Sequence, residues 1–79
     1  MSLSIIDAWF KNDYIFVKLS DGRVIKEALS RFKNLARGTQ EQRNRYKIVH
    51  EGEALRWDEL DEDLSLAGFL NNSSTDLSL

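Results

Sequence analysis

The sequence predicts an α+β fold: a small antiparallel sheet, formed by a three-stranded meander plus a second hairpin, with two or three short helices. Two observations predict it. Apolar residues alternate with a period of two in the N-terminal third and then recur at helical spacing in the middle. A second pair of short apolar runs then follows, separated by a glycine.

The meander begins with a mostly apolar run at residues 3–9, and residues 11–13, "KND", are predicted to turn it into the next strand. The second strand has the clearest pattern, because its apolar positions alternate strictly with Tyr14, Phe16 and Lys18. Asp21-Gly22 then predicts a two-residue hairpin turn, since glycine accepts a positive φ without a Cβ clash. Val24 and Ile25 open the return strand.

Two short helices are predicted in the middle of the chain. In the first, Ser30 is expected to cap the start and Gly38 to end the helix in a left-handed conformation. Its apolar face would comprise Leu29, Phe32, Leu35 and Ala36. In the second, Thr39 and Gln42 have capping-box spacing. Glu41 and Arg45 lie four residues apart and would support the same helix.

A second hairpin is predicted at residues 46–57, with Glu51-Gly52 in its turn, and a short apolar helix is predicted to follow up to Leu70. Residues 1–70 would form a single α+β domain, and residues 71–79 a flexible polar C-terminal tail. The predicted core comprises Ile5, Ile15, Val17, Leu19, Phe32, Leu35, Ile48, Leu60, Leu64 and Phe69.

Five carboxylates lie in the six positions after Trp57. The first interpretation is local: Asp61 or Asp63 caps the final helix, where its unpaired N–H groups attract negative charge. The second interpretation is a calcium-binding loop at residues 61–72. Such a loop requires glycine where this sequence has Leu66, so no metal site is predicted. The third is a partner-binding surface, with Trp57 as an aromatic anchor. The alternative for both Trp9 and Trp57 is a place in the core or at its edge.

Composition excludes several classes of protein. The chain of 79 residues has no cysteine and one histidine, so disulfides and the usual zinc ligand sets are excluded. No apolar run is long enough to cross a membrane, and the first residues do not resemble a secretory signal. We therefore expect a cytoplasmic protein with no membrane partner. Nucleotide-binding and nucleophile motifs do not occur, so we expect neither enzymatic activity nor a cofactor.

Charge is unevenly distributed along the chain. Residues 23–47 hold eight basic and two acidic residues, a balance of +6, whereas residues 48–79 have a balance of −7. One interpretation is that the two segments neutralise each other within the fold. Alternatively, the acidic segment binds a basic protein. The basic segment would then be able to bind nucleic acid through Arg37, Arg43, Arg45 and Lys47.

Two segments, "IIDAWFKNDYIFVKLSDGRVI" and "YKIVHEGEALRWDELDEDLSL", resemble the bacterial family known as domain of unknown function 2442, and "RFKNLARGTQEQRNRY" resembles its central segment. The shared signature comprises Asp21 and Gly22, then Gly52, Trp57, Asp61 and Asp63. The resemblance implies a compact α+β domain with a non-enzymatic role. Because family members often lie beside the gene of a small toxin-like protein, it also implies an antitoxin-like function.

These observations lead to a hypothesis with two alternatives. The hypothesis is a protein-interaction module, an antitoxin-like partner of a small basic protein that is a cognate toxin. Its predicted contact residues are Glu51, Glu53, Trp57, Asp58, Glu59 and Glu62. The first alternative is a nucleic-acid-binding accessory or regulatory protein that uses the basic segment. The second is a homodimer formed through an exposed strand edge.

Overall fold

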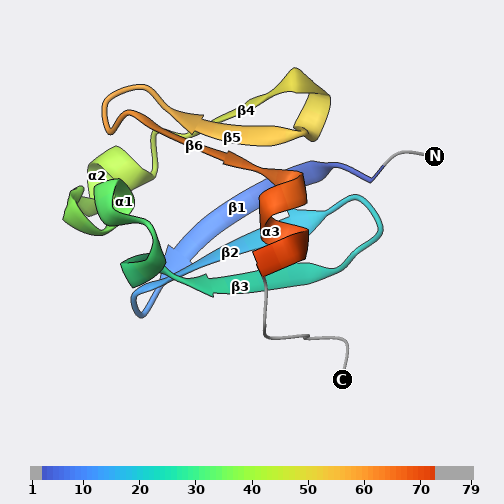
Figure 1. The fold of residues 1–79 in the computed structure, drawn as a ribbon, viewed down its shortest axis with the longest axis horizontal. Helices are drawn as coiled ribbons and strands as arrows, with labels where there is room; N and C mark the ends of the chain where they lie inside the picture. The colour runs from blue at the N-terminus through green and yellow to red at the C-terminus, as the bar shows by residue number, and fades with distance from the viewer. Residues whose placement is uncertain (1–2, 73–79) are drawn as a thin grey trace.

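A computed structural model describes residues 3–72, and these form two three-stranded antiparallel sheets with short helices (Figure 1). The predicted α+β fold is therefore confirmed. The first sheet comprises β1 (Ile5–Lys11), β2 (Tyr14–Leu19) and β3 (Val24–Ala28). The second comprises β4 (Lys47–Val49), β5 (Ala54–Trp57) and β6 (Glu62–Ser65). The helices are η1 (Leu29–Arg31), α1 (Lys33–Arg37), α2 (Gln40–Arg43), η2 (His50–Gly52) and α3 (Leu66–Asn72).

The first sheet is the predicted meander, in the order β1-β2-β3. Asn12 and Asp13 both have positive φ and form the turn predicted at residues 11–13. The loop between β2 and β3 differs from the prediction, because it contains three residues rather than two. The Leu19 N–H donates to the Arg23 carbonyl at 2.8 Å, and Gly22 has a φ of +95°. A turn followed by a left-handed glycine is the usual form of a three-residue hairpin loop.

The first middle helix is shorter than predicted, and both of its predicted ends are wrong. Ser30 does not cap it, because Leu29–Arg31 forms a separate 3₁₀ turn and α1 begins after the extended residue Phe32. Gly38 has an ordinary φ of −73°. A Cβ at this position would lie 2.8 Å from Leu60 Cδ1, so a larger residue here would require the Leu60 side chain to shift.

The second middle helix begins as predicted. The Thr39 hydroxyl accepts from the Gln42 N–H, and the Gln42 side chain accepts from the Thr39 N–H, both at 3.0 Å. The predicted ion pair between Glu41 and Arg45 is present at 3.2 Å, although Arg45 lies beyond the end of α2. The capping box therefore fixes where this short helix starts.

The second sheet contains the predicted hairpin and one strand that the sequence prediction missed. Residues 62–65 form β6, so the prediction of a helix capped by Asp61 or Asp63 is wrong. Asp61 lies in the turn before β6 with a φ of +51°, and the Ser65 hydroxyl accepts from the Gly68 N–H at the start of α3. Asn71 and Asn72 belong to α3 rather than to a tail, and residues 73–79 lie outside the described residues.

The core lies between the inner face of the first sheet, the second sheet and α3 (Figure 1). Trp57 of β5 contacts Phe10 of β1 edge-to-face, with ring centroids 6.4 Å apart, and so links the two sheets. Ile48 was predicted to be buried but is 40% exposed, because it lies on the edge strand β4. Within residues 3–72, seven buried hydrophobic residues are absent from the predicted core: Ala8, Ile25, Leu29, Ala54, Leu55, Trp57 and Leu66.

Candidate functional site between the two sheets

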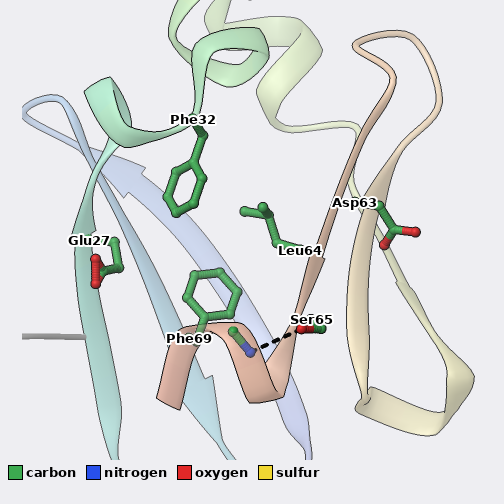
Figure 2. Close-up of a pocket in the computed structure, with 7 residues that line it drawn as sticks. Glu27, Phe32, Asp63, Leu64, Ser65 and Phe69 are labelled. Carbon is green, nitrogen blue, oxygen red and sulfur yellow. Dashed lines mark hydrogen bonds between the residues drawn. The ribbon is translucent and has the colours of Figure 1, made fainter. Parts of the chain in front are cut away.

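A pocket opens between strands β3 and β6, which belong to different sheets (Figure 2). Its volume is about 200 Å³. The side chains of Phe32, Leu64 and Phe69 point into it, and the two phenyl rings meet edge-to-face at 6.3 Å. The full lining comprises Glu27, Phe32, Asp63, Leu64, Ser65, Gly68 and Phe69. The pocket is therefore apolar inside, with carboxylates contributed by both strands.

Glu27 is the one buried charged residue among residues 3–72, with 5% of its surface exposed. It lies on the inner face of the first sheet, since burial alternates along β3. Arg31, one helical turn later, donates from Nη1 to Glu27 Oε1 at 3.1 Å. Because a buried charge is costly unless it is paired, this ion pair explains how a carboxylate is tolerated in the pocket wall.

The β6 side of the pocket contributes Asp63 and Ser65, and each has a partner within the fold. Asp63 points away from the other lining side chains and lies 3.7 Å from Arg56, its cross-strand neighbour on β5. The Ser65 hydroxyl caps α3 through the Gly68 N–H at 3.0 Å (Figure 2). The polar groups around this pocket therefore serve the fold.

The pocket is small, and the polar side chains that line it have partners within the fold. Sites for small molecules usually have volumes of about 300–1,000 Å³, larger than this pocket. Covalent catalysis needs a nucleophile within hydrogen-bond reach of a base. Here the Ser65 hydroxyl is engaged by the Gly68 N–H, and the Glu27 carboxylate by Arg31.

The predicted acidic contact residues do not form one cluster. Glu51 and Glu53 lie in the turn between β4 and β5, whereas Asp58, Glu59 and Glu62 surround the turn between β5 and β6. These turns are at opposite ends of the second sheet (Figure 1).

The prediction that Trp57 is an exposed anchor is wrong. The side chain is 1% exposed, and its Nε1–H donates to the Arg43 carbonyl at 2.8 Å. Aromatic rings on both sides, Phe10 and Tyr46, complete its packing. A partner cannot reach it in this fold, so the tryptophan holds the core together rather than contacting a partner.

Two of the predicted contact acids are engaged by the basic segment. Lys47 Nζ lies 2.7 Å from Asp58, and Arg45 pairs with Glu59. The hydrogen bond from Lys47 lowers the pKa of the Asp58 carboxyl below its ordinary value. The hydrogen bond from Arg45 lowers the pKa of Glu59 in the same way. The interpretation that the two charged segments neutralise each other therefore holds for these two pairs.

The same contacts involve most of the predicted nucleic-acid-binding residues. Besides Arg45 and Lys47, Arg43 is engaged: its Nε donates to the Leu35 carbonyl at 2.8 Å and its Nη2 to the Ala36 carbonyl at 3.0 Å. Arg43 thus satisfies the last carbonyls of α1. Arg37 is exposed at the end of that helix.

The shared signature residues have structural roles. Asp21 binds Arg23 in the β2–β3 loop at 2.7 Å, and hydrogen bonding from the Arg23 N–H lowers the pKa of Asp21. Gly52 has a φ of +91°, and a Cβ there would lie 2.6 Å from the Ser4 Cβ. Gly52 therefore allows the second hairpin to approach the start of β1.

Sequence reasoning did not find the pocket. Phe32, Leu64 and Phe69 were assigned to the core, but Phe32 and Leu64 are only half-buried. Leu64 was placed in a helix, so its position opposite β3 was not foreseen. No sequence signal indicates that β3 and β6 face each other, because they belong to different sheets.

Searches for metal-binding and membrane-spanning features were negative in the part of the chain that the structure describes. No three or more His, Asp or Glu side chains within residues 3–72 are arranged to hold a metal ion. None of the described helices has the length and apolar character needed to cross a membrane.

Fold and site together define a small α+β domain with two packed antiparallel sheets and an apolar pocket between their outer strands. The model of the family described as "Protein of unknown function (DUF2442)" matches residues 5–75, and the chain belongs to this family. No curated protein matches the sequence significantly.

The fold is also found in a solved structure. The chain is similar to the crystal structure of a protein of unknown function from Rhodospirillum rubrum ATCC 11170, with a TM-score of 0.78 and 21% sequence identity. The match covers 99% of this chain and 96% of that protein. At this identity, the similarity shows a common fold.

Proposed function

We propose that the protein is a non-enzymatic interaction module of the bacterial cytoplasm that binds a small basic protein. The pocket between β3 and β6 is the observation that carries this proposal. Its volume of about 200 Å³ and its apolar lining fit one large side chain of a partner. Side chains inserted into such desolvated pockets supply most of the affinity of many protein–protein interfaces.

The partner's basic character follows from the charges beside the pocket. Glu62 precedes Leu64 by two residues, so both side chains lie on the same side of β6. Asp61 is exposed in the adjoining turn, and neither Asp61 nor Glu62 has an ion pair within residues 3–72. These two carboxylates can steer a cationic partner towards the pocket.

The family membership supports an antitoxin-like role, in which the module masks a toxin-like protein encoded by a neighbouring gene. Of the contact residues predicted from sequence, this geometry favours Glu62. The Lys47 and Arg45 pairs already engage Asp58 and Glu59, and Glu51 and Glu53 lie at the far end of the sheet. Nucleic-acid binding through Arg37, Arg43, Arg45 and Lys47 has weaker support, because three of these four are engaged within the fold.

Binding to the purified product of the neighbouring gene tests the proposal, with affinity measured by isothermal titration calorimetry. Gly68→Leu would fill the pocket from α3, whereas Gly68→Ala adds only a Cβ near the Ser65 hydroxyl. Both replacements remove a helical glycine and so favour the helix. We expect Gly68→Leu to weaken binding by about tenfold or more and Gly68→Ala to have little effect.

A charge reversal locates the contact independently. Glu62→Lys should weaken binding strongly, whereas Glu51→Lys, the same change at the other end of the second sheet, should not. Equal effects of the two reversals would show that only net charge matters. Absence of a complex at micromolar concentration would contradict the proposed function itself.

A further inference from the structure

The outer face of the first sheet carries an ordered array of aromatic and basic side chains. The strand register places nine outward residues in three cross-strand rows. The rows are Asp7–Lys18–Val24, Trp9–Phe16–Lys26 and Lys11–Tyr14–Ala28. None of the nine is buried, whereas the alternate positions of β2, Ile15, Val17 and Leu19, are fully buried.

Two of the three aromatic rings on this face stack on each other, and none of the three is buried by the rest of residues 3–72. Trp9 and Phe16 stack across β1 and β2, with centroids 5.7 Å apart and planes 4° from parallel. Lys26 Nζ lies 4.1 Å from the centroid of the Tyr14 ring. Trp9 remains 37% exposed and Tyr14 36% exposed. Three rings and their neighbouring cations therefore face outwards on three adjacent strands.

The charge of this face is opposite to that of the whole chain. The chain has a net charge of −2, but the nine residues hold three lysines and one aspartate. The carboxylate of Asp7 is itself engaged, because its Oδ1 accepts from the Ala8 N–H and from the Tyr46 hydroxyl. The face therefore favours an anionic partner.

We propose that this outer face binds a single-stranded nucleic acid. Unpaired bases stack on exposed aromatic rings, and lysines beside the rings neutralise the phosphates. Antiparallel sheets with outward aromatic residues bind two or three bases of single-stranded RNA in this way. A protein partner fits less well, since lysine is depleted in protein–protein interfaces and this face has three lysines and no arginine.

The surface is separate from the pocket, which is lined by inner-face residues of β3 and by β6 and α3. None of Arg37, Arg43, Arg45 and Lys47 belongs to the nine residues of this face, although Arg43 lines a hollow at its edge together with Tyr14 and Ala28. The two proposals can therefore fail independently: absence of nucleic-acid binding would not contradict the proposed protein partner, and absence of that partner would not contradict nucleic-acid binding.

Fluorescence anisotropy with labelled oligodeoxyuridylate and oligouridylate of about twelve nucleotides tests the proposal at low salt. We expect both oligonucleotides to bind, and the one that binds more tightly identifies the preferred sugar. A duplex should bind more weakly than either. Trp9→Thr should weaken binding by about tenfold, and Trp9→Tyr should restore most of it, since threonine keeps the strand propensity but not the ring. Circular dichroism would verify that both variants are folded.

The lysines are tested with a matched control. Lys11→Gln combined with Lys18→Gln should reduce the slope of log affinity against log salt by about 1.4. Arg37→Gln combined with Lys47→Gln removes the same charge from the basic segment and should leave affinity nearly unchanged. A larger effect of the control pair would overturn the assignment to this face.

Besides the absence of binding, two further results would overturn the proposal. One is binding of a polyglutamate peptide as tight as that of the oligonucleotides, because it would show a general site for acidic proteins. The other is a dimer in light scattering that Trp9→Thr dissociates, because a second copy of the chain would then occupy the face. Absence of oligonucleotide binding at low salt would also refute it.

Discussion

The two sheets have the same strand pattern but are held together differently. Both are three-stranded and antiparallel, with strands adjacent in chain order. The strands of the first sheet contain seven, six and five residues, whereas those of the second contain three, four and four. Short strands form few ladder hydrogen bonds, so the second sheet depends more on contacts from outside it.

Those outside contacts come from several parts of the chain. The Trp57 ring reaches β1, and its Nε1–H binds a carbonyl at the end of α2. Arg45, which precedes β4, binds the Glu59 carboxylate in the turn after β5. The Leu66 N–H, at the start of α3, donates to the Glu53 carbonyl at 2.7 Å. The comparison shows that the first sheet is specified locally and the second by tertiary contacts.

The largest expected effect contrasts the two tryptophans. Trp57→Ala should lower the free energy of unfolding by about 3–5 kcal/mol, because it removes a buried ring that joins the sheets. Trp9→Ala removes an exposed ring from the first sheet and should cost only about 0.5–1.5 kcal/mol. Urea unfolding followed by circular dichroism measures both. Similar losses for the two variants would contradict the difference between the sheets.

Two glycines offer a smaller and sharper contrast. Gly22 and Gly52 have similar left-handed conformations, with φ of +95° and +91°, so alanine at either should cost about 1–2 kcal/mol of strain. At Gly22 an added Cβ meets nothing within 4 Å, but at Gly52 it lies 2.6 Å from the Ser4 Cβ and 3.0 Å from the Ile5 carbonyl.

We therefore expect Gly52→Ala to be less stable than Gly22→Ala by about a further 1–3 kcal/mol, the usual cost of overpacking. The difference isolates the close approach of the second hairpin to β1, since backbone strain is common to both variants. Thermal unfolding of the two variants side by side measures it. Equal melting temperatures would mean that the segment around Ser4 yields without cost.

Local signals were sufficient to predict the first sheet from the sequence. Alternation along residues 14–19 marks β2, and the turns on either side lie where expected, although the second is one residue longer. Thr39 and Gln42 likewise fixed the start of α2. In each case neighbouring residues alone determine the structure, which is why the prediction succeeded.

The second sheet and the pocket could not be predicted in the same way. Residues 62–65, "EDLS", alternate over too short a run to indicate a strand, and their pairing with β5 supplies the missing information. Trp57 followed by acids resembled an exposed contact site, but whether a tryptophan is buried depends on distant partners such as Phe10. The pocket exists only because β3 and β6 come together from different sheets.

The smallest expected effect concerns the ion pairs that fasten the second sheet. Hydrogen bonds from Lys47 and Arg45 lower the pKa values of Asp58 and Glu59 in the folded protein. Groups with lowered pKa values add stability above their unfolded pKa, about 4, and this stability is lost as the pH falls through the folded value. Asp58→Asn combined with Glu59→Gln should therefore be less stable than the wild type at pH 7.

The difference in stability between the wild type and this double variant should shrink below about pH 4, where the carboxylates become protonated. It should also shrink in 1 M salt, because both carboxylates are exposed and salt screens their ion pairs. Asp21→Asn provides the matched control in the first sheet. The pKa of Asp21 is lowered chiefly by the hydrogen bond from the Arg23 N–H, a local contact within one loop. The stability lost in Asp21→Asn should therefore depend on pH but less on salt. Salt-independent losses in both variants would show that local hydrogen bonds, rather than ion pairs between distant segments, hold the second sheet.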